Sequence, residues 1–252
     1  MCRMLIFYSL KPSTIPINLL KKFIKSCHWG YLNKYDLIGH HNAGWGYSYL
    51  PQKHSQNLVI KRTLTPIYHS QWKDLVKLKT RFFIIHARKT LLGEKKLENV
   101  HPINIGGKYC MTHNGTIKID SFPVLKNPSL QHTQENTDLD TRKYLCTILD
   151  HLNQEKTLKN AIERTINKIQ VSSAANAFLF NENECHIIKY QKDTYNGRHI
   201  TLFIEKTPKQ ILISTTPLSS TALEIPNHVL LSIPKIQSKK LTIDLHKLTL
   251  NN

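Results

Sequence analysis

The stretch MCRMLIFYS, residues 1–9, decides the fold, and the rest of the sequence is interpreted outward from it. Its apolar run, Met4 to Ser9, is typical of a buried strand. The strand begins two residues after Cys2, so we expect this cysteine at the edge of a sheet. Removal of Met1 would leave a thiol and an α-amine on one residue, and that amine, with an ordinary pKa of about 7.7–8.0, can act as a base for its own thiol. A cysteine at position two is otherwise an ordinary residue.

Beyond this strand, the hydrophobic pattern alternates between strand-like and helix-like segments. Leu20, Phe23, Ile24 and Cys27 have helical spacing after Pro16. Further helices are predicted at Trp72–Lys79 with Ser70 near the N-cap, at Thr141–Leu152 after a capping box in residues 137–140, and at Leu158–Ile169. Further strands are predicted at Tyr47–Leu50, Leu58–Arg62, Arg81–Ala87, Tyr109–His113, Ala175–Phe180, Cys185–Gln191, His199–Ile204, Gln210–Thr215, Val229–Ile233 and Leu241–Leu245. This order predicts an α+β fold of stacked sheets and helices without a domain boundary.

The composition is that of an ordered protein. Of the 252 residues, 40% are hydrophobic and 21% are charged, which allows a sizeable core. We find no run of about 20 apolar residues and no signal peptide, so we expect no membrane segment and a cytoplasmic location. The five cysteines form no CxxC pair, which predicts free thiols and no zinc site.

The formal net charge of +18 raises the possibility of nucleic-acid binding. The lysines, however, are scattered along the chain, and Lys21-Lys22, Lys95-Lys96 and Lys239-Lys240 are only pairs. We therefore predict no specific nucleic-acid partner. A basic, non-catalytic binding protein stays open as an alternative, which steep salt dependence of binding would reveal.

Three segments carry polar residues suited to binding an amino acid. His86-Ala87-Arg88 lies where a predicted strand enters a loop; it is either an ordinary segment at a sheet edge or a site where the guanidinium holds a substrate carboxylate. His113-Asn114-Gly115 is either an Asn-Gly turn or an oxyanion hole, in which the Asn amide and the Gly N–H face a developing negative oxygen. Asp138 belongs to a helix cap and can also hold an α-ammonium group. A carboxylate, an amide carbonyl and an ammonium together describe glutamine.

The motifs in chain order resemble those of stand-alone bacterial class II glutamine amidotransferases. The matching segments are Met1-Cys2-Arg3-Met4-Leu5, His41-Asn42-Ala43-Gly44-Trp45-Gly46, His86-Ala87-Arg88-Lys89-Thr90 with Gly93, His101-Pro102, Thr112-His113-Asn114-Gly115-Thr116-Ile117, Thr137-Asp138 and Thr216-Pro217-Leu218. They span nearly the whole chain. No single motif is decisive, but the ordered set is specific.

This resemblance implies the four-layer αββα sandwich of N-terminal-nucleophile hydrolases, as a single domain over residues 2–252. It implies that Cys2 is the nucleophile of a γ-glutamyl thioester, that Asn114 and Gly115 form the oxyanion hole, and that Arg88 and Asp138 anchor the carboxylate and the amine. His86 and His113 join the substrate site. It implies no metal or organic cofactor, and glutamine or a γ-glutamyl amide as the substrate, with a separate ammonia-accepting enzyme as a possible partner.

The sequence departs from the family pattern around the predicted pocket. Ala43 replaces Asp, Thr90 and Leu91 stand where Ala and Thr are usual, and Leu139 and Asp140 replace Ser and Glu. The proposed catalytic groups are all present. The identity of the substrate is therefore less certain than the reaction type, and hydrolysis of a larger γ-glutamyl conjugate remains an alternative. The segments Tyr35–Gly46 and Arg88–His101 are the candidate loops that close the site.

Overall fold

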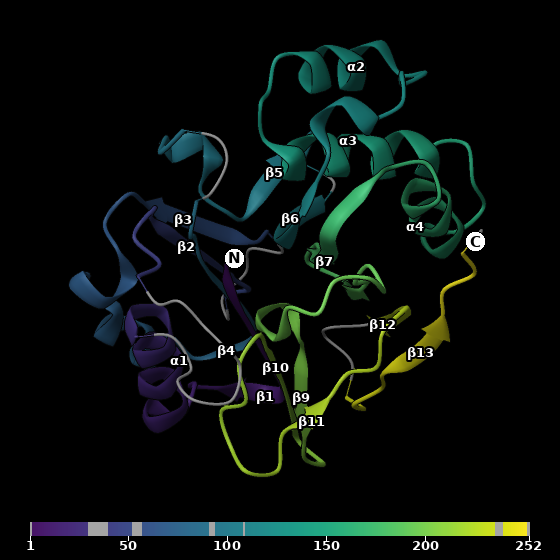
Figure 1. The fold of residues 1–252 in the computed structure, drawn as a ribbon. Coiled ribbons are helices and arrows are strands. Elements are labelled where there is room, and N and C mark those ends of the chain that lie inside the picture. The colour runs from purple at the N-terminus through teal and green to yellow at the C-terminus, as the bar shows by residue number, and fades with distance from the viewer. Residues whose placement is uncertain are drawn as a thin grey trace.

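Two antiparallel sheets lie face to face between helices, which gives four layers (Figure 1). The computed structural model describes residues 2–29, 40–51, 57–90, 94–107, 109–234 and 239–250. The predicted α+β sandwich is confirmed, and the elements that build it come from segments far apart in the sequence.

The first sheet contains seven strands in the described part of the chain, in the order β11-β9-β10-β1-β4-β2-β3. These are β1 (Arg3–Ser13), β2 (Trp45–Tyr49), β3 (Val59–Thr63), β4 (Thr80–Ala87), β9 (Phe203–Lys206), β10 (Gln210–Ser214) and β11 (Leu223–Glu224). Strand β1 pairs with β4 and β10, so the start of the chain enters the middle of the sheet. This position brings Cys2 beside the end of β4, where Arg3 pairs with Ala87.

The second sheet contains six described strands in the order β13-β12-β8-β7-β6-β5. These are β5 (Ile103–Ile105), β6 (Tyr109–Ile117), β7 (Val171–Phe180), β8 (Cys185–Lys189), β12 (Val229–Ile233) and β13 (Asp244–Lys247). Strands β7 and β8 form the predicted hairpin, in which Phe180 pairs with Cys185. Strand β6 is central to the site because it carries Asn114, which pairs with Asn176 of β7.

Alternating side chains of β1 fill two different cores. Met4 and Ile6 pack between the sheets with Phe178 of β7, whereas Leu5 and Phe7 pack on the other face against α1. Helix α1 (Ile17–Trp29) buries the predicted stripe of Leu20, Phe23, Ile24 and Cys27. Both faces of β1 are therefore covered, which fixes its register and the position of the residue that precedes it.

The outer face of the second sheet is covered by α3 (Asp140–Leu152) and α4 (Leu158–Ile166), which share a core with β6, β7 and β8. Helix α2 (Pro128–Glu135) packs against α3 and was not predicted. Short 3-10 helices complete the described elements: η1 (Ile67–His69), η2 (Trp72–Lys77), η3 (Leu97–Asn99), η4 (Ile119–Ser121) and η5 (Arg198–Ile200). Helix α3 approaches the site with its N-terminal end, at Asp140.

Several local predictions were wrong. The helix expected at Trp72–Lys79 is the 3-10 helix η2, and Ser70 is not its N-cap because the Ser70 hydroxyl donates to the carbonyl oxygen of Ile67. The capping box fails as well: the N-cap of α3 is Leu139, which has no side-chain acceptor. The strand expected from residue 199 begins at Phe203, after η5, and the one expected at Leu241–Leu245 is β13, at Asp244–Lys247.

The two glycines around Trp45 are required by close packing. A Cβ at Gly44 (φ 97°) would lie 2.5 Å from the carbonyl oxygen of Thr63, and one at Gly46 would lie 2.3 Å from that of His101. We predict that Gly46→Ala lowers the free energy of unfolding by about 1–3 kcal/mol, because the backbone of β2 and the segment at His101 must move apart. Chemical denaturation measures this change, and a variant as stable as the wild type would contradict the packing argument.

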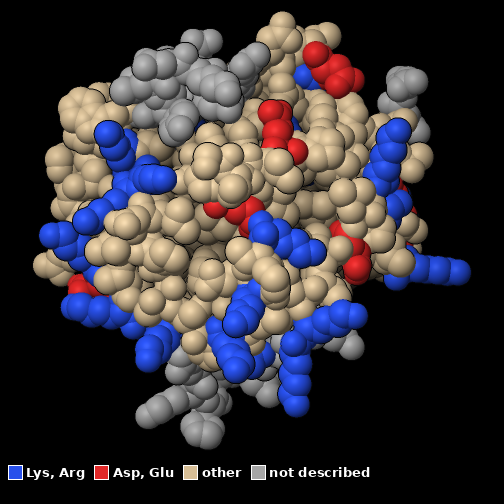
Figure 2. Space-filling view, turned by 90° about the horizontal axis from the view of Figure 1, so that it is seen from below, with Lys and Arg blue, Asp and Glu red and all other residues tan. Residues whose placement is uncertain are grey.

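Positive side chains are spread over the surface. Figure 2 shows one face, on which Lys and Arg side chains lie across the view and Asp and Glu are few. Among the described residues, none of the helices has the length and apolar character needed to cross a bilayer.

Candidate active site

Cys2 and Asn114 meet between the two sheets. The backbone nitrogen of Cys2 donates to Oδ1 of Asn114 over 2.8 Å, and its thiol lies 3.7 Å from the carbonyl oxygen of Lys89, to which it donates. Asn114 is completely buried, and its Nδ2 has no hydrogen-bond partner among the described residues. An unpaired buried amide donor costs free energy. Such a donor, on a side chain that contacts Cys2, is therefore suited to bind an oxygen that becomes negative during a reaction.

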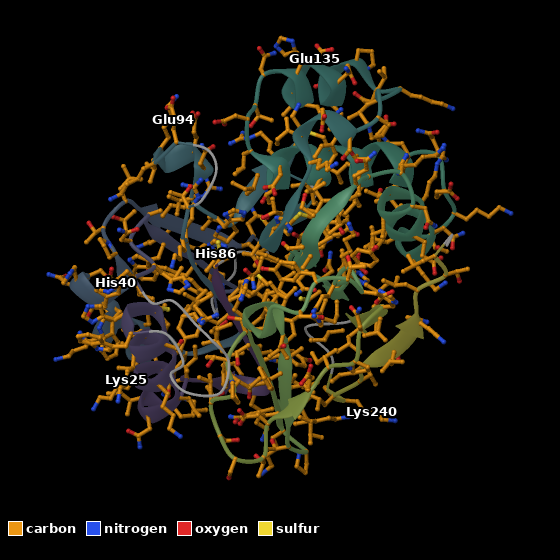
Figure 3. The ribbon with its side chains drawn as sticks, in the orientation of Figure 1. Lys25, His40, His86, Glu94, Glu135 and Lys240 are labelled. Atoms are coloured by element: carbon orange, nitrogen blue, oxygen red, sulfur yellow. The ribbon has the colours of Figure 1, made fainter. Side chains whose placement is uncertain are left out.

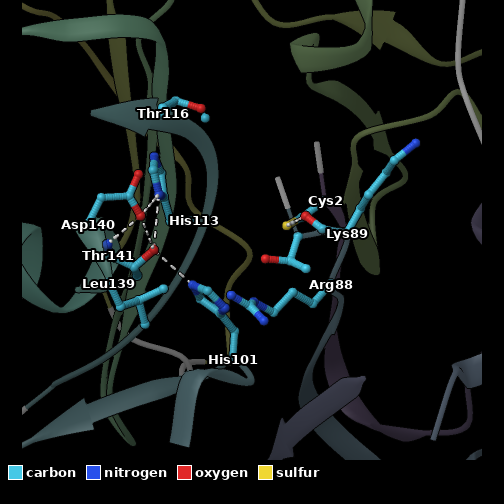
Figure 4. Close-up of a pocket in the computed structure, with 11 residues that line it drawn as sticks. Cys2, Arg88, Lys89, His101, His113, Thr116, Leu139, Asp140 and Thr141 are labelled. Atoms are coloured by element: carbon cyan, nitrogen blue, oxygen red, sulfur yellow. Dashed lines mark hydrogen bonds and ion pairs between the residues drawn. The ribbon is translucent and has the colours of Figure 1, made fainter. Parts of the chain in front are cut away.

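A pocket with about 460 Å³ of empty space opens at Cys2 (Figure 4). Its lining comes from the start of the chain, the end of β4, the end of β6 and the start of α3: Cys2, Arg88, Lys89, Thr90, His101, His113, Gly115, Thr116, Leu139, Asp140 and Thr141. In Figure 4, Cys2, Arg88 and Lys89 lie on one side of the pocket, and His113, Asp140 and Thr141 on the other.

Arg88 is positioned by backbone contacts on both sides. Its N–H donates to the carbonyl oxygen of Gly44, and its Nη1 donates to the carbonyl oxygen of Glu94 over 3.1 Å. The side chain is almost fully buried, at 3% exposure, although it lines the pocket. A guanidinium fixed in this way is suited to bind an anionic group of a ligand.

The opposite wall contains a network of polar side chains. The hydroxyl oxygen of Thr141 lies 2.9 Å from Nε2 of His101 and 3.0 Å from Nδ1 of His113. Burial by itself lowers the pKa of His113, but the Asp140 carboxylate, 3.7 Å from Nδ1, outweighs burial and raises that pKa above its ordinary value. Burial disfavours the charged carboxylate, yet His113 and two backbone N–H groups, those of Ile117 and Thr141, hold the pKa of Asp140 below its usual value. When His113 is protonated, the two side chains form an ion pair.

Gly115 must be a glycine because the neighbouring strand approaches it closely. A Cβ at this position would lie 1.7 Å from the carbonyl oxygen of Ala174 and 2.9 Å from Nε2 of His113. The expected Asn-Gly turn does not form: β6 continues to Ile117, and its register with β7 shifts between Gly115 and Ile117. Asn114 and Gly115 therefore sit at an irregularity within a strand, a feature that often occurs next to functional sites.

His86 lies behind the pocket and does not line it. It is fully buried, and its Nε2 lies 3.2 Å from the carbonyl oxygen of His113. Its ring stacks on that of His101, with 4.1 Å between the ring centroids. In Figure 3 it lies in the interior, whereas Lys25, Glu135 and Lys240 point outward. Burial is the main cause that lowers the pKa of His86 to about 3.

The low pKa of His86 predicts that the folded protein becomes less stable in acid. His86 is neutral in the folded protein, whereas an unfolded histidine binds a proton below about pH 6.5. The unfolded chain then holds more protons, so stability is present above pH 6.5 and declines as pH falls towards 3. We expect the wild type to lose about 2–3 kcal/mol from His86 between pH 6.5 and 4.5, and His86→Gln to lose correspondingly less. Urea titrations across this range measure the slope; equal slopes would show that His86 is protonated in the folded state.

The structure brings most of the predicted site residues together. The pocket is lined by Cys2, Arg88, His113 and Gly115. Asn114 contacts Cys2 through its side-chain oxygen. Asp138 is exposed and is not among the lining residues. Leu91 and Gly93 lie outside the described residues, as do residues 35–39 of the first candidate loop.

Asp140 and Thr141 were missed as site residues. Asp140 was interpreted as part of a capping box and as a departure from the family pattern, and Thr141 as the start of a helix. The signal was present, because the first turn of a helix that follows a polar loop often faces a site with its N–H groups. No group of three or more potential metal-ligating side chains was found among the described residues.

The comparisons with known proteins agree with this geometry. The family model described as class II glutamine amidotransferases matches residues 20–184, a stretch that contains Arg88, Asn114 and Asp138 and follows Cys2. A search of curated proteins found no match.

Among solved structures, the chain is similar to the glutamine phosphoribosylpyrophosphate amidotransferase of B. subtilis, with a TM-score of 0.66 and 17% identity over 99% of this chain and 50% of that one. It also resembles a glutamine aminotransferase class-II domain protein of Silicibacter pomeroyi (TM-score 0.62, 12% identity, 98% and 100% coverage) and a predicted glutamine amidotransferase of Pseudomonas aeruginosa (0.53, 12%, 94% and 97%). The chain thus spans half the length of the B. subtilis enzyme. By the family model, which covers more than half of its residues, the chain belongs to the class II glutamine amidotransferase family.

Proposed function

We propose that residues 2–252 act as one amidotransferase domain that releases ammonia from the side-chain amide of glutamine through a γ-glutamyl thioester on Cys2. The observation that supports this most directly is the arrangement of Asn114. Its Oδ1 accepts from the nitrogen of Cys2, and its buried Nδ2 is a donor without a partner among the described residues. One side chain thus holds the nucleophile and offers a hydrogen bond to the oxyanion.

In this proposal, removal of Met1 converts the nitrogen of Cys2 into an α-amine. The amine takes the thiol proton while sulfur attacks the amide carbon, and the carbonyl oxygen becomes an oxyanion bound by Nδ2 of Asn114 and the N–H of Gly115. The carbon–nitrogen bond then breaks, and the leaving nitrogen takes the proton from the ammonium of Cys2 as ammonia departs. Water, deprotonated by the same amine, hydrolyses the thioester to give glutamate. No metal or organic cofactor is needed for these steps.

The α-carboxylate and α-ammonium of glutamine need partners of opposite charge. We assign Arg88, which lines the pocket, to the carboxylate. We assign Asp138 to the ammonium: it is exposed and directly precedes Leu139, which lines the pocket. His113 completes the wall, and His86 supports it through the hydrogen bond with the His113 carbonyl.

The test compares glutamine with glutamine α-amide, which lacks the carboxylate. Release of ammonia and glutamate from glutamine by the wild type is expected, with a much higher KM for the α-amide. Arg88→Gln should raise the KM for glutamine and leave that for the α-amide nearly unchanged, because the lost ion pair exists only with glutamine. If the wild type hydrolyses neither compound after Met1 is removed, the glutamine proposal is wrong.

A γ-glutamyl hydrolase that acts on a larger conjugate is the second candidate. It would use the same nucleophile and the same oxyanion hole and would differ only in the leaving amine. Competition between glutamine and γ-glutamyl conjugates for the same enzyme separates the two: the better substrate has the higher kcat/KM. Amide hydrolysis of either kind would also exclude the non-catalytic basic binding protein.

A further inference from the structure

The oxyanion-hole residues sit where the ladder between β6 and β7 is interrupted. Asn114 pairs with Asn176 and Gly115 with Ala175, but the next paired residue of β6, Ile117, is opposite Val171. A step of two residues along β6 thus corresponds to a step of four along β7. Strand pairing thus fixes the backbone on the N-terminal side of Gly115, whereas directly after Gly115 the ladder is interrupted and another group must hold the chain.

The carboxylate of Asp140 contacts this segment at both of its ends. Oδ1 lies 3.7 Å from Nδ1 of His113, on the N-terminal side of Asn114 and Gly115. Oδ2 accepts the backbone N–H of Ile117 over 3.1 Å, on their C-terminal side. Oδ1 also accepts the N–H of Thr141 over 2.7 Å, which ties the carboxylate to the first turn of α3. The side chain of Asp140 thus contacts the chain on both sides of the two residues that provide the oxyanion donors.

Both ring nitrogens of His113 face oxygen atoms that can accept a hydrogen bond. Nε2 faces the carbonyl oxygen of Ala174 at 3.4 Å, and a carbonyl only accepts, so this nitrogen donates. Nδ1 faces the hydroxyl of Thr141 at 3.0 Å and the carboxylate of Asp140, so a proton there is also favoured. The pKa of His113 above its ordinary value has the same cause. A protonated His113 attracts the Asp140 carboxylate and donates to the carbonyl oxygen of Ala174 in β7. It thus connects α3 to β7 beside the irregular segment.

We infer that Asp140 is a positioning residue: its carboxylate bridges His113 and Ile117 and so keeps Asn114 and Gly115 aimed at the substrate carbonyl. This inference rests on the proposed function. Asp140 does not need to touch the substrate to act in this way. Its oxygens already accept the N–H of Ile117, the N–H of Thr141 and the hydroxyl of Thr141.

The test uses Asp140→Asn and Asp140→Glu, with Asp150→Asn as the matched control. Asp150 lies on the same helix, is 3% exposed, and accepts the backbone N–H groups of Lys126 and Asn127, away from the pocket. With glutamine, Asp140→Asn should lower kcat by roughly 10²-fold and change KM by less than about threefold, since the oxyanion forms only in the transition state. Asp140→Glu should recover part of kcat, and Asp150→Asn should lose thermal stability but keep kcat.

The pH profile gives a readout that a purely structural role would not move. The titratable groups that face His113 are Asp140 and Tyr144 of α3, His86 of β4, His101 and Cys2. Because the raised pKa of His113 depends on the Asp140 carboxylate, its imidazolium is present below that pKa and lost above it. In Asp140→Asn we expect the alkaline decline of kcat to begin at lower pH than in the wild type.

Two results would overturn the inference. If Asp140→Asn raises KM strongly at unchanged kcat, Asp140 binds the substrate instead of positioning the oxyanion hole. If Asp140→Asn and Asp150→Asn lower kcat equally, in step with their thermal midpoints, the effect is general destabilisation. Failure of the proposed function gives a different outcome, because then the wild type itself shows no turnover of γ-glutamyl amides.

Discussion

Cys2→Ala is expected to abolish turnover of glutamine. Among the described cysteines, Cys2 lines the pocket, and the other four are buried elsewhere. Removal of a covalent nucleophile costs on the order of 10⁶-fold in kcat where a single residue carries the chemistry. Alanine is as small as cysteine, so Met1 is still removed, and a loss of activity cannot be attributed to failed processing. A steady-state ammonia assay measures the effect.

The matched control for Cys2→Ala is Cys27→Ala. Cys27 lies in α1, on the opposite side of β1, and burial raises the pKa of its thiol to about 12. A thiol with this pKa is not a nucleophile at neutral pH. We expect Cys27→Ala to retain kcat and to lose some stability. Equal activity of Cys2→Ala and the wild type would mean that the amidase mechanism is wrong.

The second large effect is expected for Asn114→Ala. It removes both the acceptor of the Cys2 nitrogen and the unpaired Nδ2 donor. Loss of one oxyanion donor lowers kcat by about 10²–10³-fold, and loss of the anchor for the amine adds to it. KM should change little, because the ground-state carbonyl does not need the donor as strongly as the oxyanion does.

Asn176→Ala is the control for that variant. Asn176 is the cross-strand partner of Asn114 and is equally buried, but its amide groups bind the backbone of Tyr190 and Ile200. It should unfold more easily than the wild type and keep kcat within a few-fold. If both substitutions reduce kcat alike, burial and packing explain the loss, and Asn114 has no special role.

The position of Cys2 could be predicted from the sequence because the strand signal in residues 4–9 is continuous and local. The hydrophobic run fixes β1, and β1 fixes the residue before it. The same holds for the helix α1, whose apolar stripe is buried as its spacing predicts. Local periodicity was sufficient wherever one face of an element meets a core.

The local geometry of Asn114-Gly115 could not be predicted in the same way. In isolation, Asn-Gly favours a turn, but pairing with β7 keeps the segment extended and the Ala174 carbonyl excludes any side chain at Gly115. The capping box failed for a related reason. Asp140 contacts His113 and the N–H of Ile117 as well as the first turn of its own helix, so its role depends on β6 too. Both result from tertiary contacts, which local sequence propensities do not include.

The most direct test of the central claim is labelling by a diazo-ketone analogue of glutamine, followed by intact mass measurement. The wild type should lack Met1 and gain one label, which peptide mapping places on Cys2. Cys2→Ala should also lack Met1 and gain no label, and Cys27→Ala should be labelled like the wild type. A processed, folded wild type that takes no label, or a Cys2→Ala variant that is labelled equally, would contradict the account of Cys2 as the nucleophile of a γ-glutamyl site.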